Sequence, residues 1–207
     1  PGEVVPRGLV RVVSRAVPAI RRGSGRLELA DWLASRENPL TARVQVNRVW
    51  LRLFGRGIVP TPDNFGAAGQ PPSHPELLDT LAVSFMDEGW SVKSLIRRIV
   101  LSRAYRLGSS FDARNDEVDP DNTLVWRMSK RRLEGEAIRD AMLAISGQLN
   151  LYPMAGSPVA RAGDGNSAPL QRNGGAFDLR LPCRSVYLPV LRNHFLESLA
   201  LFDFADP

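Results

Sequence analysis

Residues 38–66 read N-P-L-T-A-R-V-Q-V-N-R-V-W-L-R-L-F-G-R-G-I-V-P-T-P-D-N-F-G, and residues 70–81 read Q-P-P-S-H-P-E-L-L-D-T-L. Apolar side chains recur at helical spacing in the first segment. This pattern predicts a buried helix over residues 39–54, with Asn38 as N-cap and Gly55 as left-handed C-cap. In the second segment Ser73 and Glu76 spell a capping box, which predicts another helix. The Gly/Pro-rich residues 55–72 between them are expected to form an irregular but stiff loop.

One polar side chain, Asn47, falls on the apolar stripe of the first helix. A buried amide without partners costs about 1–3 kcal/mol, so Asn47 must form hydrogen bonds. We expect it to bond a carbonyl group of the loop 55–72, and the alternative is contact with a ligand. For His74, its place at the start of the second helix favours a structural role, with catalysis as the alternative.

Acidic and basic residues alternate in blocks along the chain. Residues 61–90 contain five acidic residues and no Lys or Arg, whereas residues 39–56 supply Arg43, Arg48, Arg52 and Arg56. This complementarity predicts at least one Arg–carboxylate contact between the two segments. Because the basic segments lack interleaved exposed aromatic residues, nucleic acid is not expected as a partner.

An ordered string of motifs runs through most of residues 26–207. It includes N-P-L-T-A-R-V-x-V-N-R-V-W, D-N-F-G, P-S-H-P-E-L-L-D, G-W-S-V-K-S-L-I-R-R-I-V-L-S, D-P-D-N-T-L-V-W-R, R-R-L-E-G-E-A-I-R-D-A-M-L-A-I-S-G and S-V-Y-L-P. The string closely resembles a planctomycete-type domain of unknown function. That family lies towards the C-terminus of large secreted proteins, many of which carry cytochrome-c-like domains upstream. The resemblance therefore implies an extracytoplasmic, multidomain protein, with this segment truncated at its C-terminus.

The fold class predicted from these patterns is mainly α: an irregular helical domain with long Gly/Pro-rich loops. Residues 1–25 are expected to form an extended N-terminal arm or linker, and residues 26–207 a single helical domain with a loop-rich insertion at 151–182. Further helices are predicted at 26–35, 92–102 with Ser91 as its cap, 130–146 and 191–202. One small β-hairpin, formed by residues 177–181 and 184–188, is an option.

The chain has few residues that could hold a metal or cofactor. Cys183 is the only cysteine, and His74 and His194 are the only histidines, so neither an internal disulfide nor a zinc site is expected. The C-x-x-C-H motif is absent, so any haem c would belong to another domain of the full-length protein. The acidic residues at 112–121 do not have the spacing of a calcium-binding loop. No apolar run is long enough to span a membrane.

Two functions follow from these observations. We favour a non-catalytic scaffold or interaction domain that docks a neighbouring domain of the same polypeptide, because no nucleophile–base set or phosphate-binding loop is present. The alternative is an enzyme or ligand-binding domain that acts on polysaccharide, with Asp63, Glu76 or Asp79 as carboxylates. The candidate ligand-binding residues are Arg43, Asn47, Arg48, Asp63 and His74; no catalytic or metal-binding residue is assigned.

Overall fold

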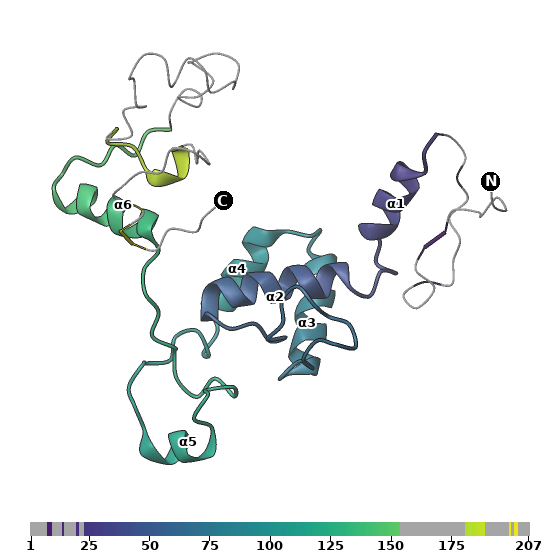
Figure 1. Cartoon of the computed structure of the whole chain (residues 1–207), viewed down its shortest axis with the longest axis horizontal. Coiled ribbons are helices and arrows are strands. Elements are labelled where there is room, and N and C mark those ends of the chain that lie inside the picture. The colour runs from purple at the N-terminus through teal and green to yellow at the C-terminus, as the bar shows by residue number, and fades with distance from the viewer. Residues whose placement is uncertain are drawn as a thin grey trace. The chain divides into compact units, whose positions relative to one another are not determined.

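The computed structural model describes residues 8, 9, 14, 20, 23–153, 181–188, 199, 201 and 202. Internal contacts divide the chain into two units, Pro1–Lys130 and Arg131–Pro207, which are described separately below. The first unit contains α1 (Arg26–Leu33), α2 (Thr41–Phe54), α3 (Pro75–Asp87), α4 (Val92–Val100) and α5 (Ala113–Val118) (Figure 1). The second contains α6 (Gly135–Ile145) and the 3-10 helix η1 (Ser185–Tyr187). The predicted mainly helical fold is confirmed, since the described residues form no strand.

The core of the first unit lies where α2, α3 and α4 pack against one another (Figure 1). Trp50 stacks on Phe54 with ring centroids 4.0 Å apart, and the Tyr105 ring meets Phe54 edge-on at 5.6 Å. The other buried apolar side chains come from the three helices and from the loop after α2: Ala42, Val46, Val49, Ile58, Val59, Leu78, Leu81, Ala82, Phe85, Leu95 and Ile99. The stripe predicted from helical spacing is buried in part: Val46, Asn47, Val49, Trp50 and Phe54 are buried, whereas Val44, Leu51 and Leu53 are half-buried and Leu40 is exposed.

Both ends of α2 are held by residues that the sequence singled out. The helix begins at Thr41 rather than at Pro39, but the Asn38 side chain still accepts the backbone N–H groups of Leu40 and Thr41, at 2.9 and 3.2 Å. At the other end Gly55 has φ +85° and donates its N–H to the Leu51 carbonyl. The predicted left-handed C-cap is confirmed, and glycine suits it because it has no Cβ.

The predicted capping box at α3 is wrong. His74 occupies the N-cap position, and it makes no side-chain capping bond. The Ser73 backbone N–H and hydroxyl both donate to the Ile58 carbonyl instead, at 2.8 and 3.2 Å. Ser73 therefore fastens the preceding loop rather than the helix. The predicted cap of α4 is confirmed, because Ser91 Oγ accepts the N–H of Ser94 at 3.3 Å.

The second unit departs further from expectation. Helix α6 spans 11 residues instead of the predicted 130–146. Residues 184–188, predicted as half of a hairpin, include η1, and the nearby Cys183 forms an isolated bridge with Asn150. That half of the hairpin prediction is wrong. Its partner segment lies outside the described residues except for Leu181, as do most of the predicted arm, insertion and final helix.

Candidate functional site

Asn47 is the most buried of the candidate residues, with no exposed surface. Its amide nitrogen donates to the Val59 carbonyl at 3.0 Å, and its amide oxygen accepts the Val59 N–H at 2.8 Å. The prediction that Asn47 ties the helix to the loop is thus confirmed. Gly57 makes this approach possible, because a Cβ there would lie 2.5 Å from the Val59 carbonyl oxygen and 2.9 Å from both Asn47 amide atoms.

The predicted Arg–carboxylate contacts also exist. Arg43 Nε donates to Asp79 at 2.6 Å, which joins α2 to α3. This hydrogen bond lowers the pKa of Asp79 and raises that of Arg43, with the attraction between the two charges adding to each shift. Arg48 reaches Asp63 at 3.5 Å, but both side chains are more than half exposed. Such an exposed pair contributes little to stability.

His74 lies at a small cavity of about 30 Å³, lined among others by Trp50, Phe54, Arg56 and Thr123. This volume admits one or two water molecules. The imidazole Nδ1 is 3.0 Å from Ser73 Oγ, and Arg56 donates to the Thr123 hydroxyl at 3.2 Å. Of the five candidate residues, only His74 lines this cavity. Their role in ligand binding stays a prediction.

Sequence reasoning missed the loop 119–129, which is held by side chains of its own. The carboxylate of the buried Asp119 accepts the backbone N–H groups of Thr123 and Leu124, at 2.9 and 2.7 Å, and the Asp119 backbone carbonyl accepts Trp126 Nε1 at 2.9 Å. Within this loop Val125 has φ +57°. A β-branched residue in the left-handed region costs of the order of 1–3 kcal/mol, so the surrounding bonds must hold it there.

Asp112, Asp116 and Asp119 each have a structural partner of their own rather than a common centre. Asp112 caps α5 by accepting the N–H of Asn115 at 3.0 Å, and Asp116 pairs with Arg127 at 3.6 Å. Across the part of the chain that the structure describes, no three His, Cys, Asp or Glu residues are grouped so as to hold a metal ion.

A second polar network lies in the second unit and was also missed. The Arg139 guanidinium donates to the carbonyls of Cys183 and Leu181, at 2.9 and 2.6 Å, and to Ser185 Oγ at 3.1 Å. Asp140 Oδ1 accepts both the N–H and the hydroxyl of Ser185, each at 2.7 Å. Adjacent charged residues on α6 therefore hold the 181–185 segment, 40 or more positions along the chain.

This network turns the predicted inward face of α6 outward. The spacing of apolar residues in the helix expected at 130–146 predicts that Leu133, Ala137, Ala141, Ala144 and Ile145 face the core. All five are exposed, and Ile145 exposes 88% of its surface. Four of them follow the i, i+4, i+7, i+8 spacing of one helix face: Ala137, Ala141, Ala144 and Ile145. We call these four residues the α6 stripe. The expectation failed because the inward positions are taken by Arg139 and Asp140.

Comparison with known proteins gives one match. A family model described as "PSD1: Protein of unknown function (DUF1553)" matches residues 25–207. No curated protein and no solved structure matches the chain. Among the described residues, no helix has the length and apolar character needed to cross a membrane.

Proposed function

The chain belongs to PSD1, a family of proteins of unknown function (DUF1553), and from its geometry we propose that it is a non-catalytic interaction domain. Its partner would be a neighbouring domain of a longer polypeptide. The observation that carries this proposal is the exposure of the α6 stripe, on a helix whose Arg139 and Asp140 face inward. Aligned apolar side chains exposed on one helix face are typical of surfaces that bind another protein.

The bonding of the candidate polar residues supports the same proposal. Asn47 uses its amide on Val59, and Arg43 joins Asp79. These bonds fasten helices and loop to one another, so they give each side chain a structural role. An enzyme acting on polysaccharide would need some of the same groups to change partners during the reaction.

The wider setting follows from the sequence resemblance. The resemblance implies secreted relatives that often carry cytochrome-c-like domains, so we propose that this domain lies outside the cytoplasm, beside such a domain. A helix face of small alanines next to one large Ile145 can approach another protein surface closely. The occupant that fits is therefore an apolar surface of the adjoining domain.

The proposal is tested by mixing the 207-residue chain with its separately expressed neighbouring domains and measuring binding by calorimetry. Ala141→Glu and Ile145→Glu place a charge on the α6 stripe, and each should weaken binding at least about tenfold. Val118→Glu is the matched control, because Val118 is 80% exposed but belongs to α5 and not to the stripe. Circular dichroism would establish that all three variants are folded.

Two results would contradict the proposal. One is the absence of binding to any neighbouring domain; the other is equal binding by the stripe variants and Val118→Glu. Sedimentation could instead show that the wild-type chain associates with itself and that Ile145→Glu does not. This result would show that a second copy of the chain occupies the stripe.

A further inference from the structure

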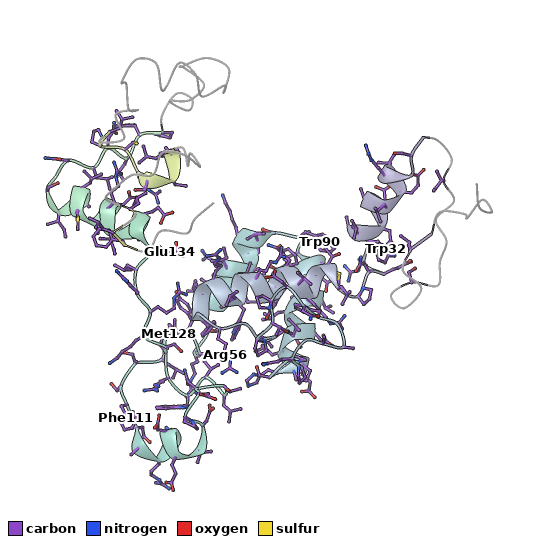
Figure 2. The ribbon with its side chains drawn as sticks, in the orientation of Figure 1. Trp32, Arg56, Trp90, Phe111, Met128 and Glu134 are labelled. Atoms are coloured by element: carbon purple, nitrogen blue, oxygen red, sulfur yellow. The ribbon has the colours of Figure 1, made fainter. Side chains whose placement is uncertain are left out.

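The first unit contains a cleft of about 230 Å³ beside the loop 119–129. The residues that matter here are Ser109, Asp121, Asn122, Met128, Ser129 and Lys130, which all line it. Figure 2 labels Met128 on this part of the chain, and Phe111 next to α5. The cleft is smaller than the roughly 300–1,000 Å³ of drug-sized sites, so it suits a single small chemical unit.

The walls of the cleft are fixed before any ligand arrives. The Asn122 amide donates to the Arg127 carbonyl at 2.9 Å and to Ser129 Oγ at 3.1 Å, and it accepts the Arg127 N–H at 3.2 Å. The Met128 N–H donates to the carbonyl of Gly108 at 3.0 Å, which holds the opposite side. A ligand would therefore meet a preorganised surface, and little entropy would be lost in ordering it.

Several polar groups around this cleft are not used by the fold. Within the described part of the chain, the side chains of Ser109, Asp121 and Lys130 have no hydrogen-bond or ion-pair partner. Ser129 Oγ accepts from Asn122 and keeps its own proton to donate. A carboxylate, an ammonium and two hydroxyls thus line one cleft, and each can bond a ligand.

The charges indicate what kind of ligand fits. The Arg127 guanidinium is already paired with Asp116 and lies 4.5 Å from the centre of the Trp126 ring and 5.8 Å from that of Phe111. This leaves Asp121 and Lys130, whose charges cancel. A neutral ligand that both donates and accepts hydrogen bonds matches this balance, and sugar hydroxyls do both. The Met128 side chain adds an apolar surface for the C–H face of a sugar ring.

We propose that this cleft binds one unit of a neutral saccharide, with Asp121 accepting from and Lys130 donating to its hydroxyls. None of Asn47, Arg48, Asp63 and His74 lines this cleft, although Asn122 and Ser129 line both the cleft and the small cavity at His74. The cleft is independent of the α6 stripe, so either proposal can fail without the other.

The chain itself supplies a probe for the test. It has only two lysines, Lys93 and Lys130, so reductive ¹³C-methylation gives one NMR signal from the cleft, one from Lys93 and one from the N-terminal amine. Neutral gluco-, manno- and galacto-oligosaccharides are titrated to millimolar concentration. The Lys130 signal should shift with saturation, and the Lys93 signal should stay in place.

Variants identify the groups responsible. Asp121→Asn and Lys130→Gln should each weaken binding about tenfold in the unlabelled protein, measured by calorimetry. Glu117→Gln and Lys93→Gln are matched controls, because both residues are exposed and neither lines the cleft. The proposal is overturned if no neutral saccharide shifts the Lys130 signal, or if all four variants bind alike. Tighter binding of free amino acids or of anionic sugars would overturn the ligand class.

Discussion

The side-chain amide of Asn47 forms two hydrogen bonds with the backbone of one residue, Val59, twelve positions later. Both bonds are buried, and they satisfy the donor and the acceptor of Val59 as a neighbouring strand would. The loop after α2 is therefore attached to the helix at a defined register.

Replacing Asn47 by Leu should lower the free energy of unfolding by about 2–4 kcal/mol, because the buried N–H and C=O of Val59 lose their partners. A denaturant titration monitored by tryptophan fluorescence would measure this loss of stability. Gln45→Leu is the control, because Gln45 lies in the same helix and its side chain makes no hydrogen bond within the described part of the chain. It should change stability by less than about 0.5 kcal/mol. Wild-type stability in Asn47→Leu would contradict the structural role of the amide.

Gly57→Ala tests the close approach that the same bonds require. The added Cβ would lie 2.5 Å from the Val59 carbonyl oxygen, so the backbone must shift and stability should fall by more than about 1 kcal/mol. Gly108→Ala is the control, since a Cβ there meets nothing within 4 Å. In the double variant with Asn47→Leu the two losses should not add, because both break one contact. Additive losses would mean that Gly57 acts elsewhere.

The Arg43–Asp79 pair should make a small, pH-dependent contribution. The pKa of Asp79 is lowered in the folded protein, so the pair stabilises the fold above the ordinary aspartate pKa of about 3.9. This contribution is lost as the pH falls from there through the lower folded-state value. Asp79→Asn should therefore lower the free energy of unfolding by less than about 1 kcal/mol at pH 7, because the carboxylate is largely exposed. It should have no effect at a pH below the folded-state pKa of Asp79, where the wild-type carboxyl is protonated too. A cost that persists at low pH would show that Asp79 acts through packing.

Arg139→Lys should loosen the segment 181–188. A guanidinium reaches two carbonyls and Ser185 Oγ together, whereas one ammonium lacks that fork, and a loss of about 1–3 kcal/mol is expected. Hydrogen exchange of the Ser185 and Tyr187 amides reports this directly. Arg184→Lys is the control, because the Arg184 side chain is half exposed and its contact with Asp140, at 3.9 Å, is long and weak. Unchanged protection in Arg139→Lys would exclude this role.

The sequence predicts the first unit better than the second, for a physical reason. The apolar spacing of α2 and the buried amide of Asn47 are local signals. The spacing predicts the helix and part of its buried face, and the predicted role of the amide is confirmed. The prediction for Ser73 is wrong, because its hydroxyl bonds the Ile58 carbonyl, 15 residues earlier, and does not cap the N–H groups of the helix that follows. For α6, periodicity identified an apolar stripe but not whether the stripe faces the core or the solvent. That orientation depends on the bonds of Arg139 to residues more than 40 positions away.

The cleft could not have been predicted at all. It lies beside a loop in which Val125 has a left-handed backbone, a conformation that valine rarely adopts and that no propensity indicates. The preceding D-P-D-N sequence does signal a turn, and Asn122 does have positive φ. That signal locates the loop without giving its shape.

The two fastenings of the loop after α2 divide it into parts with different evolutionary freedom. Ile58 and Val59 are held from one side by Asn47 and from the other by Ser73, so any residue gained or lost between Gly55 and Val59 would break the register. Beyond them, residues 61–70 close on themselves through the Thr61 hydroxyl, which bonds Asn64 and Gln70. Insertions and deletions among relatives should therefore accumulate in this outer part, while the five positions after α2 keep a constant length.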